Sequence, residues 1–178
     1  LGFWAEVADE TVARIAADER RRVLASGCGT VSVALADPAS LPRGTPRGEA
    51  PPVETTRALF KELFHRGERY EQTGGVHAAA LTDGHALLGH AEDIGRHNAV
   101  DKVIGGALLG GRDPAGLGLL VTGRISAELA FKAARAGLAW VATPSVPSTL
   151  ALTIARRAGV ILVGRAVSGH PEVHRGDA

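Results

Sequence analysis

The chain has 178 residues, of which 45% are hydrophobic and 22% are charged. This globular composition excludes a mostly disordered chain, a collagen and a coiled-coil rod. The formal net charge is +1 and aromatic residues make up 4%, so neither a basic nucleic-acid surface nor a base-stacking platform is predicted. No apolar run approaches the roughly 18 residues of a membrane-spanning helix, and the single cysteine, Cys28, excludes a disulfide within the chain.

The first part of the chain, residues 1–53, is dominated by turn-forming residues. Cys28 lies between Gly27 and Gly29, and five prolines follow between residues 37 and 53. Core strands rarely have glycine on both sides of a residue, so we expect the thiol to be presented on a loop. The alternative is the commoner fate of a lone cysteine, burial as a small hydrophobic residue. The proline-rich stretch predicts a loop or linker that leads into a separate α/β domain over residues 54–178.

The middle of the chain alternates between helix and hairpin patterns. Apolar residues at helical spacing predict helices over 54–66 and 98–109, and two short apolar runs around Thr82-Asp83-Gly84 predict a hairpin of strands 76–81 and 85–91. Glycine inside a helix costs stability. The pair Gly105-Gly106 in the second helix therefore predicts close packing against another backbone.

The last third of the chain alternates strand and helix. Near-continuous apolar runs predict strands over 117–122, 138–143 and 160–164, separated by helices over 126–136 and 148–159. Such strands are typical of a parallel sheet covered on both faces. Together with the hairpin, they predict an α/β fold with a mixed, mostly parallel sheet.

The loops after these strands carry the polar residues expected of a binding site. Ligands of such sheets bind outside the carboxyl ends of the strands, which here are followed by residues 92–97, 123–126, 144–148 and 165–170. Helix N-termini favour anions, and guanidinium groups strengthen such contacts. Each serine alone is more often a simple cap, but the four loops together predict a phosphate or pyrophosphate site. Its expected contacts are Arg96, Asn98, Arg124, Ser126 and Ser148.

Several histidines and carboxylates occur close together in the middle of the sequence: His77, His85, His90, Glu92, Asp93 and His97. Their spacing matches no familiar metal-binding motif. Glu92 and Asp93 beside Arg96 are equally compatible with an ion pair in a loop. No metal site is predicted.

Three segments carry a family resemblance. They are TGGVHAAAL at 73–81, EDIGRHNAVDKVIG at 92–105 and GRISAEL at 123–129. They resemble the FdhD family of formate dehydrogenase accessory sulfurtransferases, over about residues 27–173. Family chains are longer at the N-terminus, and the sequence lacks methionine. We therefore expect a truncated N-terminal portion, of which residues 1–53 are the remnant.

The resemblance implies a function and a setting. Family members are cytoplasmic sulfur carriers that take persulfide sulfur from a cysteine desulfurase. They pass it to the molybdenum cofactor, molybdenum bis(molybdopterin guanine dinucleotide), which formate dehydrogenase requires. The family is homodimeric, and its large domain is similar in fold to cytidine deaminases without their zinc chemistry. No permanently bound metal, nucleic acid or membrane partner is implied.

The resemblance also implies site residues. Cys28 matches the sulfur-bearing cysteine of a Gly-Cys-Gly motif, whereas Val31 stands where the family often has a second cysteine. One thiol must therefore serve alone. The stretch Val167, Ser168, Gly169, His170, Pro171 and Glu172 matches the cofactor-binding stretch of the family. It departs from the arginine and the Asn-x-Tyr ending that the family favours there.

Two other functions remain open from the sequence. The first is a cofactor-binding chaperone without sulfur chemistry, which the valine at position 31 favours. The second is a deaminase-like nucleotide enzyme that would use His77 and Glu92 with a metal.

Overall fold

The computed structural model describes residues 8–10, 44, 48–67, 73 and 75–176. Cys28 and Val31 lie outside the described residues, so the expected exposure of the thiol stays a prediction. The division of the chain into two parts at residue 53 also stays a prediction. Residue 53 is the first residue of a long helix described below.

Within the described part of the chain, one mixed sheet of six strands forms the centre of the domain, in the order β2-β1-β3-β4-β5-β6. Its strands are β1 (His77–Thr82), β2 (Leu87–Asp93), β3 (Gly118–Val121), β4 (Trp140–Ala142), β5 (Ile161–Gly164) and β6 (Glu172–His174). The neighbours β3, β4 and β5 are parallel to one another. The pairs β1–β2, β1–β3 and β5–β6 are antiparallel. The expected mixed α/β sheet is confirmed, with its parallel part in the three strands that alternate with helices.

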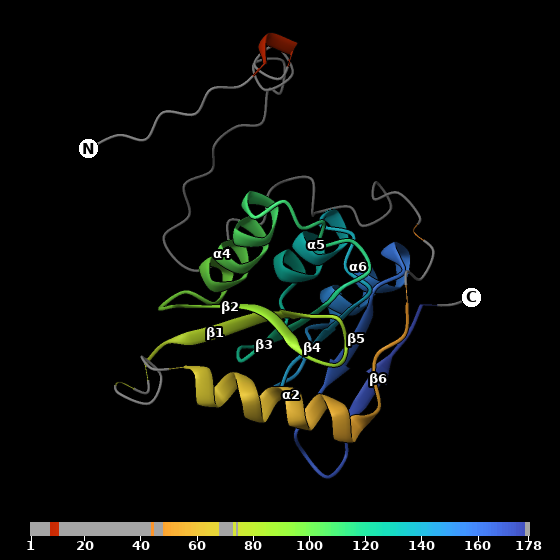
Figure 1. Cartoon of the computed structure of the whole chain (residues 1–178). Helices are drawn as coiled ribbons and strands as arrows, with labels where there is room; N and C mark the ends of the chain where they lie inside the picture. Colours follow the sequence, from red (N-terminus) through yellow and green to blue (C-terminus); the bar gives the residue numbers. More distant parts are fainter. Residues whose placement is uncertain (1–7, 11–43, 45–47, 68–72, 74, 177–178) are drawn as a thin grey trace.

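Helices cover both faces of the sheet, as predicted (Figure 1). One face carries α4 (Arg96–Leu109), α5 (Ala127–Arg135) and α6 (Thr149–Ala158), and the other carries α2 (Val53–Arg66). Alternate residues of each strand supply the two apolar layers. In β3, Leu119 and Val121 face the three-helix layer, whereas Leu120 packs with α2.

The strand β3 begins at a glycine because an aromatic ring lies over it. A Cβ atom built on Gly118 would lie 2.1 Å from Cε2 of Trp140 in the neighbouring strand. No side chain fits at that distance, so the ring of Trp140 takes the place of one. Trp140 is only 3% exposed, and its burial contributes to the layer beneath α2.

The helices α5 and α6 begin and end within one residue of their predicted bounds. The Oγ atoms of Ser126 and Ser148 accept hydrogen bonds from the backbone N–H groups of Leu129 and Ala151. Both helices are followed by a glycine in the left-handed region, Gly137 and Gly159, each with φ of 70°. This conformation is easy for glycine, so each chain reversal is short.

The topology brings several strand ends to one edge of the sheet. The parallel strands β3, β4 and β5 all end there. Because His77 pairs with Asp93 and Ala79 pairs with Val121, β1 begins and β2 ends at the same edge. The polar loops that follow β2, β3, β4 and β5 therefore share this edge, which we call the loop edge.

The strand β6 is not predicted from the sequence. It has three residues and begins at Glu172, within the stretch expected to bind the cofactor. Between β5 and β6 the chain turns at Arg165, which has a positive φ of 50°. Its backbone N–H donates to the carbonyl of Ser145 at 2.7 Å, and the N–H of Ala166 donates to that of Thr143. These bonds tie the turn to the end of β4.

Candidate functional site

The centre of the loop edge is formed by Arg96, His77 and Gly123. Arg96 is the first residue of α4, and its side chain packs against the backbone that follows β3. A Cβ atom built on Gly123 would lie 3.1 Å from Cδ of Arg96 and 3.2 Å from Cε1 of His77. Glycine at this position therefore allows the two side chains to lie against the main chain.

The guanidinium of Arg96 has a hydrogen-bond donor that none of the described residues uses. Its Nε is buried and has no hydrogen-bond partner among the described residues. Leaving a buried donor unpaired is costly, so an acceptor supplied by a ligand would stabilise this arrangement. Burial, and then the charge of Arg96, lower the pKa of His77. The imidazole is therefore neutral beside a permanent positive charge at neutral pH.

The N-terminus of α4 already holds a carboxylate of the protein. Asp93 Oδ1 accepts hydrogen bonds from the backbone N–H of Gly95 at 2.8 Å and from Nδ2 of Asn98 at 3.1 Å. Its Oδ2 lies 2.6 Å from Nζ of Lys102. The bond from Lys102, followed by those from Gly95 and Asn98, holds the pKa of Asp93 at about 2. Asn98 thus orients a carboxylate at this helix end, and its contact with a ligand remains a prediction.

Ser126 lies against His97, which belongs to the group of histidines noted in the sequence but not to the expected binding residues. The Oγ of Ser126 and the Nε2 of His97 are 3.4 Å apart, and the Nδ1 of His97 lies 3.7 Å from a carboxylate oxygen of Glu128. Burial lowers the pKa of His97, with Arg96 and Lys132 acting in the same direction against Glu128. A neutral imidazole therefore spans α4 and α5 at the loop edge.

Hydrogen bonds hold the loops after β3 and β4 together. The buried Thr143 hydroxyl donates to the carbonyl of Gly123 at 2.7 Å. The backbone N–H of Ile125 donates to the carbonyl of Val146, and that of Ser148 donates to the carbonyl of Ile125. The N-termini of α5 and α6 thus begin in a rigid pair of loops, so their dipoles have fixed positions.

The second predicted arginine differs from the first. Arg124 directly follows Gly123 and is exposed. None of the described residues makes a hydrogen bond or an ion pair with its side chain. Arg124 can therefore contact a ligand at the loop edge from the solvent side. Arg96 can contact the same ligand through its buried Nε.

The stretch 167–172 leaves the loop edge and reaches α2 on the other face of the sheet. An Nη2–H of Arg57, in α2, donates to the carbonyl of Ser168. Beside this contact lies a groove of about 300 Å³, which we call the α2 groove. Its lining residues are Arg57, Phe60, Lys61, Phe64, His65 and Val167.

A family model described as the FdhD/NarQ family matches residues 3–178. The chain belongs to the FdhD/NarQ family. A sulfur carrier protein FdhD from Streptomyces coelicolor is 42% identical over 152 residues, which are 82% of this chain and 54% of that protein. The Burkholderia mallei protein of the same name is 44% identical over 153 residues, 82% of this chain and 56% of its own. The chain therefore spans about half the length of these curated relatives.

Two solved structures are similar to this chain, one at 31% identity and one in fold alone. A putative formate dehydrogenase accessory protein from Desulfotalea psychrophila has a TM-score of 0.67 and 31% identity, over 76% of this chain and 58% of its own. A diaminohydroxyphosphoribosylaminopyrimidine deaminase/5-amino-6-(5-phosphoribosylamino)uracil reductase from Thermotoga maritima has a TM-score of 0.50 and 14% identity, over 65% of this chain and 37% of its own. The expected resemblance to a deaminase fold is thereby confirmed at the level of the fold.

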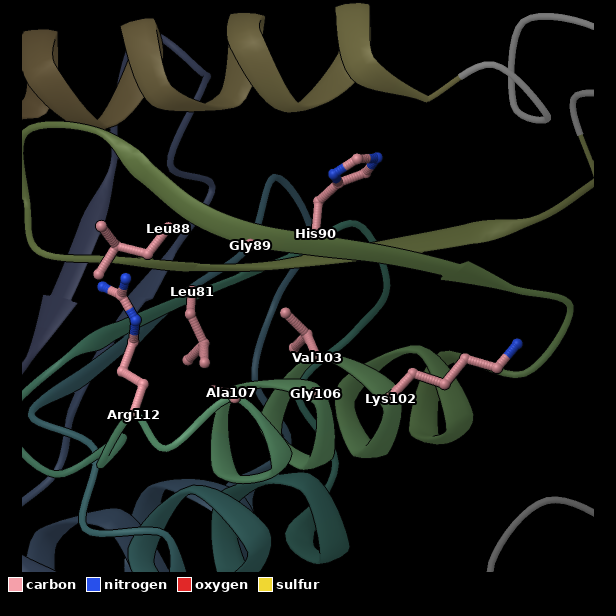
Figure 2. A pocket seen from close by; sticks show the side chains of 10 residues that line it. Leu81, Leu88, Gly89, His90, Lys102, Val103, Gly106, Ala107 and Arg112 are labelled. Atoms are coloured by element: carbon pink, nitrogen blue, oxygen red, sulfur yellow. The ribbon is translucent and has the colours of Figure 1, made fainter.

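A second cavity of about 300 Å³ lies between β2 and α4, away from the loop edge (Figure 2). Leu81 and Val103 form its floor, and Gly89 and Gly106 line its walls. A Cβ atom built on Gly106 would meet no atom within 4 Å among the described residues. The close backbone packing predicted from Gly105-Gly106 is therefore wrong within this part of the chain, and the glycine leaves a hollow in place of a contact.

The structure brings together part of the predicted set. Arg96, Asn98, Arg124 and Ser126 lie at the loop edge, while Val167, Ser168, Gly169, His170, Pro171 and Glu172 run from it towards α2. His77, His97, Thr143 and Arg57 are additional to that set. No group of three or more metal-ligating side chains occurs within the described ranges. No helix in those ranges is long and apolar enough to cross a membrane.

Proposed function

We propose that this chain carries sulfur for the maturation of formate dehydrogenase. In this proposal it works as a cytoplasmic homodimer, accepts persulfide sulfur from a cysteine desulfurase on Cys28, and delivers it to molybdenum bis(molybdopterin guanine dinucleotide), its substrate. Membership of the FdhD/NarQ family supports the proposal. The relatives named sulfur carrier protein FdhD and the solved structure of a putative formate dehydrogenase accessory protein also support it.

The observation that carries the cofactor part of the proposal is the buried Nε of Arg96, which has no hydrogen-bond partner in the described part of the chain. It lies at the edge where α5 and α6 begin and where Arg124 is exposed. A phosphate oxygen would accept a hydrogen bond from this nitrogen, and the two helix N-termini would favour its negative charge. The residues present therefore fit a ligand with phosphate groups.

The sulfur step needs one thiolate. The Cys28 thiolate attacks the outer sulfur of the donor's cysteine persulfide, the S–S bond of the donor breaks, and a new S–S bond forms on Cys28. The donor cysteine leaves as a thiolate with the electron pair of the broken bond, and the proton stays on the transferred outer sulfur. The reaction consumes no oxidant or reductant.

The test is sulfur loading followed by mass spectrometry. The full chain is incubated with an active cysteine desulfurase and cysteine, and the mass is measured without reductant. We expect one added sulfur atom on the peptide that contains Cys28, and none in Cys28→Ser. A folded wild-type chain that gains no sulfur from an active donor would contradict the proposal.

A second candidate function is a chaperone that holds the cofactor without sulfur chemistry. The observation that favours it is Val31, which leaves a single cysteine in the chain. In this case Cys28→Ala would still support formate dehydrogenase maturation in cells, whereas Arg124→Ala would lower cofactor retention. Under the sulfur-carrier function, Cys28→Ala abolishes maturation, so the same assay separates the two.

A further inference from the structure

The cavity between β2 and α4 exists because glycines stand on both of its walls. The strand β2 is the outermost strand of the sheet, and a Cβ atom on its Gly89 would lie 3.9 Å from Cγ2 of Val103 in α4. Beside this contact, Gly89 and Gly106 line a cavity of about 300 Å³ whose floor includes the buried Leu81. Side chains normally fill the space between a helix and a sheet, so an open space of this size is unusual.

The two adjacent glycines of α4 lower the stability of the helix without allowing close packing. Glycine is less favourable than alanine within a helix. A Cβ atom on Gly105 or Gly106 would meet none of the described residues within 4 Å. Of the two, Gly106 lines the cavity and Gly105 does not. A ligand in the cavity would lie against the backbone at Gly106, which gives a glycine at this position a physical reason.

The end of α4 places Arg112 at the mouth of the cavity. Gly111 has a positive φ of 75°. Its backbone N–H donates to the carbonyl of Leu108, and that of Arg112 donates to the carbonyl of Ala107 at 2.8 Å. These bonds form a Schellman motif, which fixes the backbone of Arg112 against the last turn of the helix. Figure 2 shows its side chain extending from this turn towards Leu88 of β2.

Arg112 is the basic side chain of the lining that is best placed to bind an anion. The lining contains no carboxylate. Lys102 is already engaged by Asp93, 2.6 Å from its Nζ, and the imidazole of His90 points away from α4 (Figure 2). The guanidinium of Arg112 is exposed and makes no hydrogen bond or ion pair with any of the described residues. It can therefore pair with an anion without giving up a partner in this part of the chain.

The size and chemistry of the cavity select a class of ligand. Its volume of about 300 Å³ lies at the lower end of small-molecule sites. The apolar floor of Leu81 and Val103 suits one ring or a short branched chain. A single guanidinium matches a single carboxylate, which it can bind through two parallel hydrogen bonds.

We propose that this cavity binds a small monocarboxylate, with its apolar body in the hollow beside Gly106 and its carboxylate paired with Arg112. The site lies away from the loop edge. The inference goes beyond the proposed function and does not depend on it, because neither Cys28 nor the polar loops take part.

The experiment is a nuclear magnetic resonance titration of the ¹⁵N-labelled full chain with 3-phenylpropionate. We expect saturable shifts of the amide signals of Gly89 and Gly106. The matched probe is 3-phenylpropanol, which has the same apolar body without the charge. It should bind about tenfold more weakly, because it cannot form the charged hydrogen bonds to Arg112.

Three variants separate the two parts of the site. Arg112→Gln, at an exposed position, should weaken 3-phenylpropionate about tenfold, to the level of the alcohol. Gly106→Leu should abolish binding, because the leucine side chain fills the hollow. Leucine is a better helix former than glycine, so this loss is not expected from unfolding, and the dispersion of the spectrum checks the fold. Gly105→Leu is the control, because it makes the same change in α4 outside the lining and should keep the affinity.

Three results would overturn the inference. One is the lack of saturable shifts at Gly89 and Gly106 in the wild-type chain. Another is equal affinity for the acid and the alcohol, which would remove the role of the carboxylate. The third is an unchanged affinity for the acid in Arg112→Gln or in a folded Gly106→Leu chain. If Gly106→Leu does not fold, the result for Arg112→Gln decides.

Discussion

Two glycines, one beside α4 and one within it, have opposite surroundings. Gly123, after β3, has the side chains of Arg96 and His77 within 3.2 Å of the position of a Cβ atom, whereas a Cβ atom on Gly106, within α4, would meet none of the described residues within 4 Å. The first glycine allows a close approach at the loop edge. The second opens a cavity between α4 and β2 and costs helix stability.

This difference shows that a glycine in a family motif has no single meaning. Both residues lie in or beside segments that carry the resemblance to the FdhD family, at 92–105 and 123–129. Only the structure separates a glycine that positions charged groups from one that leaves a hollow. Matched substitutions at the two positions, and in the hydrogen bonds around them, test that distinction.

The largest effect is expected from Gly123→Ala. The added methyl group would lie against Arg96 and His77, which must move, and overpacking of this kind costs about 1–3 kcal/mol. We expect a lower free energy of unfolding in urea and weaker binding of inorganic pyrophosphate in calorimetry. Unchanged stability and affinity would show that the close approach has no role.

Thr143→Val tests the bond that holds Gly123 in place. The valine removes the hydroxyl that donates to the buried carbonyl of Gly123 at 2.7 Å, and the loss is expected to cost about 1–2 kcal/mol. Urea unfolding measures the change. Thr143→Ser is the control, because it keeps the hydroxyl and removes only the methyl group, and a Val variant as stable as the wild-type chain would contradict a role for this bond.

The half-buried histidines of the loop edge, His77 and His97, predict a dependence of stability on pH. Burial lowers the pKa of both His77 and His97 below the ordinary value of 6.5, so below that pH the unfolded chain binds more protons than the folded one. The contribution of these two groups to the free energy of unfolding is fully present above pH 6.5. It decreases as the pH falls from 6.5 towards their pKa values in the folded chain. Urea unfolding across this range should show the fall, and His77→Gln should reduce it; a slope that is the same in both proteins would contradict the assignment to His77.

The smallest effect is expected from Gly106→Ala, the only one of these variants that we expect to be more stable than the wild-type chain. The methyl group enters an open cavity, and alanine is favoured over glycine within a helix by about 0.5–1 kcal/mol. We expect a higher free energy of unfolding and an unchanged affinity for pyrophosphate. A loss of stability would reveal a contact at this position that the cavity does not show.

The sequence predicts the elements whose signals are local. The apolar runs that form β3, β4 and β5 and the serine caps of α5 and α6 are found within one or two residues of their predicted bounds. The shared loop edge follows from the same alternation, because parallel strands end on one side. Its arginines, Arg96 and Arg124, could therefore be placed before their contacts were known.

The remaining features depend on contacts between distant segments. The strand β6 is a three-residue edge strand, too short for an alternating pattern. His97 gains its role from Ser126, 29 residues away, and Arg57 from Ser168, 111 residues away. Likewise, the cavity beside Gly106 becomes visible only when α4 is packed against β2. Neither propensity nor periodicity contains information on these pairs.

The left-handed turn at Arg165 gives the molecule a fixed corner. The chain leaves the end of β5, bends at a residue with φ of 50°, and passes to the side of α2 while bonded to the loop after β4. The direction in which residues 167–172 leave the sheet is therefore set by the end of β4, so a change in the loop after β4 is expected to displace them.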